Sequence, residues 1–191
     1  QIRTEGIREW RKEADRYNRY EATPYAALDA LFRAYKLKPT DRVVDFGCGR
    51  GRVCFYIHNH FNVPVTGIEN NDLTFTEALK NKAIYRQKYQ NLTAPIRFKY
   101  GLAEQYPIQP EENVFYFFNP FSLDIFKQVV HNILQSVNQY PRTVDIIFYY
   151  PLPEYHEFLV SHTPFQLINK VKAYEKHGTY GKFHIYRLKE K

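Results

Sequence analysis

Along most of the chain, short apolar runs alternate with longer stretches in which apolar residues recur every three or four positions. The short runs have the length of buried strands, and the longer spacing is typical of helices with one apolar face. Strands are predicted at 42–46, 64–69, 96–100, 114–119 and 144–150, and helices up to about residue 60, at 73–89, 123–138 and 154–161. Nearly continuous apolar strands that alternate with helices predict a parallel sheet covered on both faces.

The N-terminal part of the chain precedes this alternation and is predicted to be helical. Apolar residues at helical spacing within 7–17 indicate a first amphipathic helix. A second helix is predicted to start at Thr23-Pro24, because Thr is a good N-cap and Pro suits the first helical position, and to end near Lys38-Pro39.

The C-terminal part breaks the alternation in another way. Residues 165–174 and 182–188 both have strand character, and no helix separates them. We therefore expect a terminal antiparallel hairpin. No linker-like composition interrupts the chain, so residues 1–40 are interpreted as N-terminal helices of the same domain as a core at 41–191.

Composition is that of an ordinary globular protein, with 44% hydrophobic and 25% charged residues among 191. No apolar stretch approaches the roughly 20 residues of a membrane helix, and we expect no membrane association. The two cysteines, Cys48 and Cys54, form neither a disulfide framework nor a common metal motif, which favours the cytoplasm and predicts no metal. The sequence contains no Met, so the natural N-terminus is expected upstream of Gln1.

The formal net charge of +7 is unevenly distributed. The basic surplus lies in residues 1–104 and 166–191, whereas 105–165 is net acidic. Positive surfaces attract phosphates and acidic proteins, but they also serve solubility alone. A nucleic-acid partner is therefore left open.

The stretch Val43 to Arg52 contains the strongest chemical signal, an acid and three glycines in Asp45-x-Gly47-x-Gly49-x-Gly51. A strand that runs into such a turn and then a helix lets the backbone approach a ligand closely. A dinucleotide fingerprint would need glycine at position 52, where this chain has Arg52. Asp45 would also repel a pyrophosphate, whereas it suits a ligand with ammonium and sulfonium charges.

This pattern resembles motif I of the class I S-adenosylmethionine-dependent methyltransferases. The resemblance covers about residue 42 to the C-terminus. It implies a Rossmann-like α/β fold: a seven-stranded, mostly parallel sheet with a C-terminal antiparallel hairpin, flanked by helices. It also implies S-adenosylmethionine as the cofactor, bound by a turn that includes Asp45, Gly47, Cys48, Gly49 and Gly51.

Two further segments resemble the cofactor-binding positions of that family. Glu69, at the end of the next strand, matches the acid that accepts hydrogen bonds from both ribose hydroxyls, and Asn70 follows it. Leu102, Ala103 and Glu104 match the adenine position. Leu stands where the family commonly has Asp, so backbone groups are expected to take part in recognition of the adenine.

The segment Asn119-Pro120-Phe121 resembles the motif IV position, where the transferred methyl group lies. In methyltransferases that act on amide or exocyclic nitrogens, Asn-Pro-Pro-aromatic holds the target nitrogen and stacks on the target. This chain has one Pro where that motif has two. The three residues are candidate catalytic residues, and Asn119 alternatively holds the amino acid end of the cofactor or shapes the turn.

A substrate side is expected around the segment before the first strand. Tyr20, Thr23 and Tyr25 are candidate lid residues, because related enzymes place the preceding helix over the methionine end of the cofactor. Tyr150 leaves a strand toward the same face and is a candidate substrate contact. Thr23 as an ordinary helix cap, and Tyr150 as a packing residue, are the alternatives.

The resemblance implies an enzyme that transfers a methyl group to a nitrogen or oxygen nucleophile of a protein, RNA or small-molecule acceptor. A catalytically silent, cofactor-binding regulatory protein is the main alternative. An NAD-dependent oxidoreductase is a weaker one, which Arg52 and Asp45 disfavour.

Overall fold

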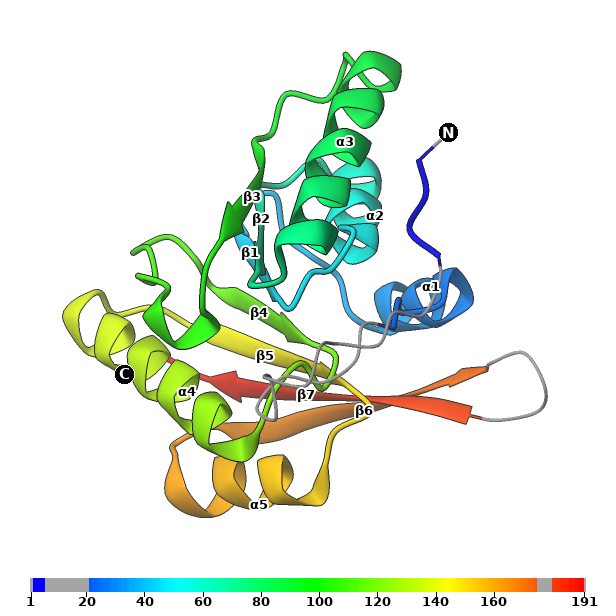
Figure 1. Ribbon diagram of the computed structural model, residues 1–191. Coiled ribbons are helices and arrows are strands. Elements are labelled where there is room, and N and C mark those ends of the chain that lie inside the picture. The colour runs from blue at the N-terminus through cyan, green and yellow to red at the C-terminus, as the bar shows by residue number, and fades with distance from the viewer. Residues whose placement is uncertain (1, 6–20, 175–179, 191) are drawn as a thin grey trace.

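The structure is a computed structural model that describes residues 2–5, 21–174 and 180–190. The first predicted helix and Tyr20 lie outside these residues. Seven strands and five α-helices follow one another along the described chain (Figure 1). The strands are β1 Val43–Phe46, β2 Val65–Glu69, β3 Ile96–Tyr100, β4 Val114–Phe117, β5 Val144–Tyr149, β6 Gln166–Tyr174 and β7 Tyr180–Leu188. The helices are α1 Tyr25–Ala34, α2 Arg52–Phe61, α3 Asp72–Lys88, α4 Leu123–Gln139 and α5 Pro153–His162, with a short 3₁₀ helix η1 at Ala103–Gln105.

The strands form one sheet in the order β3-β2-β1-β4-β5-β7-β6. Strands β1 to β5 are parallel, and β7 runs antiparallel to both β5 and β6. The seven-stranded sheet and its terminal hairpin confirm the predicted architecture. The chain order reverses between β1 and β4, and ligands of open α/β sheets bind at the carboxyl ends of the strands beside such a switch point.

The sheet has a separate apolar core on each face. Figure 1 shows α1, α2 and α3 on one side and α4 and α5 on the other, in agreement with the two buried clusters. On the α4 side the rings of Phe46, Phe117 and Phe148 stack across β1, β4 and β5 in register, with centroids 5.2 and 5.1 Å apart. These buried rings fix the relative positions of the three strands whose ends meet at the switch point.

Helix α1 differs from its predicted bounds at both ends. It begins at Tyr25 with Pro24 as the N-cap, and the Thr23 side chain does not cap it. Instead, the Thr23 hydroxyl is buried and lies 2.8 Å from the hydroxyl of Tyr116 on β4. The helix ends at Ala34 because Tyr35 turns away in an extended conformation and donates a hydrogen bond of 2.6 Å to the buried Asp145.

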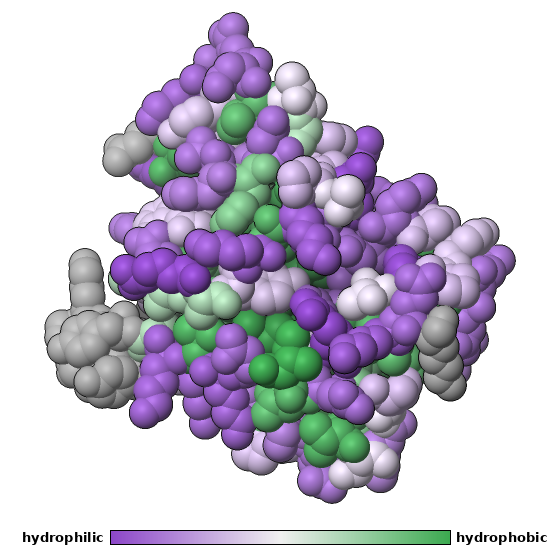
Figure 2. Space-filling model, turned by 180° about the vertical axis from the view of Figure 1, so that it is seen from behind, coloured by the Kyte–Doolittle hydropathy of each residue, from purple (hydrophilic) through white to green (hydrophobic). Residues whose placement is uncertain are grey.

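The outer surface is largely polar. Figure 2 shows hydrophilic residues over most of one face, including its upper part, with apolar residues gathered in the lower middle. Among the described residues, none of the helices has both the length and the apolar character that crossing a membrane requires.

Candidate cofactor-binding site

The glycine turn joins β1 to α2 at the switch point. Gly47, Gly49 and Gly51 all have positive φ, a region that other residues enter at a cost. Gly47 also packs directly on the loop after β4, since a Cβ atom there would lie 2.5 Å from Cβ of Pro120. The turn and the Asn-Pro-Phe segment are therefore in contact.

The two cysteines pack where α2 crosses β2. A Cβ atom on Gly67 would lie 2.6 Å from Sγ of Cys48 and 2.9 Å from Sγ of Cys54. Both thiols are buried, and burial raises the pKa of the Cys48 thiol to about 11. They lie in close packing against the sheet, and their raised pKa makes them poor nucleophiles at neutral pH.

Glu69 ends β2 beside the turn, with its side chain 4% exposed. Its two carboxylate oxygens accept hydrogen bonds from the backbone N–H of Gly49, at 2.7 Å, and of Asn71, at 2.9 Å. Burial raises the pKa of this carboxyl group, and the two N–H donors oppose the rise. The side chain is thus held in one orientation beside the turn.

Asp45 is a second buried carboxylate, on β1 next to the turn. The thiol of Cys54 donates to it at 3.4 Å, and no lysine or arginine of the described residues forms an ion pair with it. Burial, reinforced by the charge of Glu69, raises the pKa of Asp45 from 3.8 to about 7. A buried acid without a cation suits a ligand that brings a positive charge.

A small pocket of about 20 Å³ lies in front of Asp45. It is lined by strand residues, the glycine turn, the start of α2 and residues 21–23. Its lining residues are Glu21, Ala22, Thr23, Asp45, Gly47, Cys48, Arg52, Val53, Tyr116 and Phe118. This volume holds about one water molecule. These lining residues fit the charged end of the expected cofactor. That end is larger than the pocket, so residues 21–23 need to move aside for it to bind.

The ends of β4 and β5 carry the predicted acceptor-side residues. Asn119 and Tyr150 each lie two residues beyond the paired Phe117 and Phe148, and both have positive φ, at 40° and 51°. Such backbone costs about 1–3 kcal/mol per residue and is concentrated at functional sites. Two neighbouring strand ends with the same unusual backbone therefore support the prediction that this edge is functional.

The aromatic rings at this edge differ in accessibility. Phe121 is 1% exposed, and its ring packs edge-to-face on Phe117, so it belongs to the apolar core. Phe118 and Tyr150 are partly exposed, with rings 24° from parallel and centroids 6.2 Å apart. In this structure these two rings, and not Phe121, form the aromatic surface beside Asn119.

The predicted adenine-side residues lie at the end of β3, next to Glu69. The N–H of Gly101 donates to the carbonyl of Glu69 at 3.0 Å and joins the two strand ends. Leu102 is 37% exposed, Ala103 is buried, and the carbonyl of Glu104 accepts from the side chain of Asn132. Asn70 is partly buried after β2.

Arg52 is the residue whose role the sequence does not reveal. It opens α2 and is 7% exposed, and its guanidinium group contacts two segments far away in the chain. It donates to the hydroxyl of Thr4 at 3.0 Å and to the carbonyl of Thr23 at 3.2 Å. We call the described residues 2–5 and 21–24 the N-terminal strap. Arg52 places this strap against the glycine turn.

Within the described part of the chain, no group of three or more His, Cys, Asp or Glu residues is arranged to hold a metal ion. His58 is buried, and its contacts indicate that it stabilises the fold. Its ring nitrogens lie 2.7 Å from the hydroxyl of Tyr85 and 2.7 Å from the carbonyl of Ala94.

No protein-family model and no curated protein matches the chain, whereas solved structures resemble it in fold. TrmN from Thermus thermophilus has a TM-score of 0.63 at 17% identity over 83% of this chain, which spans 47% of that protein. An RNA methyltransferase from Salinibacter ruber, in complex with S-adenosyl-L-homocysteine, has a TM-score of 0.62 at 17% identity, covering 90% of this chain and 95% of its own. A SAM-dependent methyltransferase from Methanosarcina mazei has a TM-score of 0.64 at 13% identity, covering 84% of this chain and 98% of that protein.

Proposed function

We propose that this chain, whose fold is that of the class I methyltransferases, binds S-adenosylmethionine and transfers its methyl group to a nitrogen or oxygen acceptor. The observation that carries the proposal is the pair of buried carboxylates, Asp45 and Glu69, on either side of the glycine turn. Asp45, a carboxylate without a cationic partner among the described residues, suits an ammonium group, and the oriented carboxylate of Glu69 suits a pair of hydroxyl groups.

Each of the candidate residues is assigned to one part of the cofactor. Asp45 takes the ammonium group at the amino acid end, and Glu69 accepts from the ribose hydroxyls while the N–H groups of Gly49 and Asn71 keep it in place. Asn70, Leu102, Ala103 and Glu104 provide the adenine side at the ends of β2 and β3. The bound cofactor supplies a methyl group already activated by a sulfonium, so the protein has to supply alignment and a dry site.

The acceptor side is formed by Asn119, Phe118 and Tyr150. The Asn119 amide can orient a nitrogen or oxygen nucleophile, and the Phe118 and Tyr150 rings offer flat apolar surfaces beside it. Flat surfaces next to a hydrogen-bonding amide suit a planar acceptor. We propose an RNA base, and the neighbours from Thermus thermophilus and Salinibacter ruber, the latter named as an RNA methyltransferase, are consistent in fold with this choice.

The acceptor proposal predicts transfer of radiolabelled methyl groups to RNA and not to a protein extract. Tyr150→Ala is expected to lower kcat/KM for RNA about tenfold, since stacking on an aromatic ring contributes about 1–3 kcal/mol per base. Tyr150→Phe should retain most of the rate. Tyr140→Ala is the matched control, because Tyr140 is exposed at the end of α4. Equal losses in both alanine variants, or transfer to protein alone, would contradict the RNA proposal.

Asp45 predicts a pH dependence of cofactor binding. Its carboxyl group has a pKa of about 7, and only the ionised form attracts an ammonium group. Affinity for S-adenosylhomocysteine should therefore rise up to about tenfold per unit as pH increases toward 7, and then level off. Calorimetry at pH 5.5–8 in two buffers should detect proton release below pH 7. Asp45→Asn should remove that release, and a persistent release in this variant would assign it to another group.

The same group has the opposite effect on the stability of the free protein. An acid whose pKa is higher in the folded than in the unfolded state binds more protons when folded. Asp45 therefore lowers the free energy of unfolding as pH rises from about 4 to about 7. Opposite slopes for stability and affinity distinguish Asp45 from a general loss of structure at low pH.

The same experiments distinguish an enzyme from a regulatory protein that binds the cofactor without transferring its methyl group. Such a protein would show the calorimetric binding and its pH dependence, but no labelled product with any RNA, protein or small-molecule pool. A protein that bound neither S-adenosylmethionine nor S-adenosylhomocysteine while folded would contradict the proposed function altogether.

A further inference from the structure

The guanidinium group of Arg52 connects both halves of the N-terminal strap. Beyond the bonds to Thr4 Oγ1 and Thr23 O, it donates to the carbonyls of Thr4, at 3.1 Å, and Ala22, at 3.4 Å. Its central carbon lies 4.9 Å from the ring centroid of Tyr25. Thr4 and Thr23 are 3% and 1% exposed, so these bonds are shielded from water.

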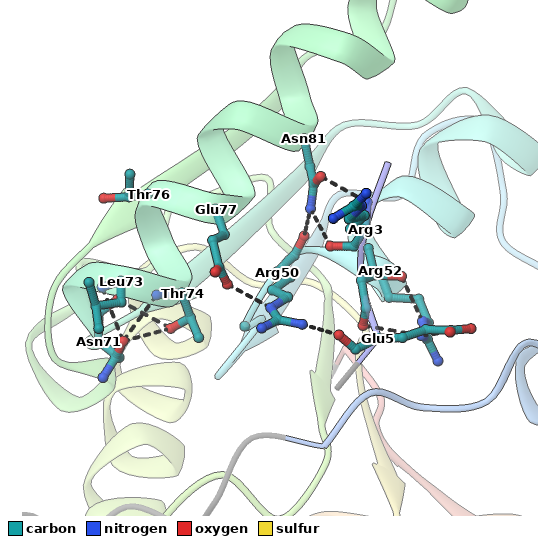
Figure 3. A network of polar contacts seen from close by, with 12 residues as sticks. Arg3, Glu5, Arg50, Arg52, Asn71, Leu73, Thr74, Thr76, Glu77 and Asn81 are labelled. Atoms are coloured by element: carbon teal, nitrogen blue, oxygen red, sulfur yellow. Dashed lines mark hydrogen bonds and ion pairs between the residues drawn. The ribbon is translucent and has the colours of Figure 1, made fainter. Parts of the chain in front are cut away.

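A second set of contacts fixes the first half of the strap to α3 (Figure 3). The side chain of Asn81 accepts from the N–H of Arg3 at 3.1 Å and donates to the carbonyl of Arg3 at 3.0 Å. It also donates to the carbonyl of Arg50. Arg50 pairs with Glu77 at 2.6 Å and donates to the carbonyl of Glu5. The strap is thus attached to the residues around the glycine turn itself.

The second half of the strap lines the small pocket in front of Asp45. Glu21, Ala22 and Thr23 line the pocket together with residues of the turn, and the hydroxyl of Thr23 lies 2.8 Å from that of Tyr116 on β4. The pocket of about 20 Å³ is too small for a methionine-sized group. A ligand that reaches Asp45 must therefore displace the second half of the strap, and Arg52 opposes that displacement.

We propose that Arg52 is a clasp that holds the N-terminal strap over the pocket and thereby controls how fast the cofactor enters and leaves. This inference rests on the proposed function. Arginine suits the role because its planar group directs donors to Thr4 and Thr23 at once, whereas a lysine ammonium is a compact charge on a flexible stem. Arg52 is a positioning residue in this scheme.

The test measures exchange of S-adenosylhomocysteine by stopped flow, with a fluorescent analogue of S-adenosylhomocysteine as the signal. Arg52→Ala should raise both the association and the dissociation rate constants about tenfold, because it removes several hydrogen bonds to a charged group. Arg52→Lys, the milder variant, should raise both rates less. Arg86→Ala is the matched control: Arg86 likewise donates to two carbonyls, of Leu92 and Ala94, remote from the strap.

The association rate constant distinguishes a residue that controls ligand entry from one that only stabilises the fold. A purely structural role would leave association unchanged or slower in both Arg52 variants, and that result would overturn the inference. Amide exchange is measured in parallel on protein without ligand. Faster exchange at residues 2–5 and 21–23 in the Arg52 variants, with wild-type exchange in β1, shows that Arg52 holds the strap, whether or not the chain binds S-adenosylhomocysteine. Unchanged exchange there would overturn it independently of the proposed function.

Discussion

Replacement of Gly47 by alanine is expected to lower the free energy of unfolding by about 3 kcal/mol. An L-residue in the left-handed region costs about 1–2 kcal/mol, and overpacking costs about 1–3 kcal/mol more. Gly47 has φ of 75°, and an added Cβ atom would lie 2.5 Å from Cβ of Pro120. Because Pro120 belongs to the Asn-Pro-Phe segment, relief of the clash should also displace Asn119 and lower methyl transfer. Urea denaturation followed by circular dichroism measures the loss of stability.

Gly101 offers a control that separates backbone strain from the clash. It also has positive φ, at 156°, but an added Cβ atom there meets nothing within 4 Å. Gly101→Ala should therefore lose less stability than Gly47→Ala and leave the position of Asn119 unchanged. If the two variants were equally stable, the contact between the glycine turn and Pro120 would contribute nothing to the fold.

Replacement of Glu69 by glutamine is expected to weaken S-adenosylhomocysteine binding about 100-fold. The variant loses charged hydrogen bonds to two ribose hydroxyls, each worth about 1.5–3 kcal/mol. It also directs an NH₂ group toward an N–H donor, of either Gly49 or Asn71. Isothermal titration calorimetry measures the affinity, and thermal unfolding of the free variant shows how much of the loss arises from the turn.

Glu112→Gln is the matched control for Glu69. Glu112 is also a buried acid with two hydrogen bonds, from the Tyr106 hydroxyl at 2.6 Å and the Gln109 N–H at 2.9 Å. It precedes β4 and so lies toward the amino ends of the parallel strands, away from the turn. The control should lose stability but keep its affinity. Unchanged affinity in Glu69→Gln would mean that the ribose is not bound at the end of β2.

Much of the sheet could be predicted because each strand is marked by residues that are adjacent in the sequence. The buried strands are continuous apolar runs, and the acid-glycine turn marks where β1 ends, so β1 and β2 lie within two residues of their predicted positions. The ends of α1 could not be predicted in this way. Thr23 and Tyr35 have good helical context in the sequence, but each reaches a buried partner about a hundred residues away, Tyr116 and Asp145. Tertiary hydrogen bonds override the local preference.

The candidate site shows the same division between local and distant information. The glycine turn and Asp45 are recognisable from the local pattern and Glu69 from the resemblance, and the structure brings them together. Phe121 is buried in the apolar cluster on the α4 side, whereas Phe118 and Tyr150 are partly buried against the cluster on the opposite face of the sheet, and no local pattern records this division. Arg52 is visible in the sequence only as a missing glycine, since its hydrogen-bond partners Thr4 and Thr23 are uncharged and its charged contact, Glu5 at 3.9 Å, is far away in the chain.

The hydrogen bond between Tyr35 and Asp145 limits how the pocket can open. Asp145 is also held by Arg187 of β7, with both contacts at 2.7 Å, and the inner face of α1 is buried through Ala27, Leu28 and Leu31. Helix α1 is therefore fixed to the sheet at its C-terminal end and along its buried face, and it is not free to rotate away from the sheet as a rigid body. If the proposed strap opens, we therefore expect a short movement of residues 21–23 that pivots at Pro24 while α1 stays in place.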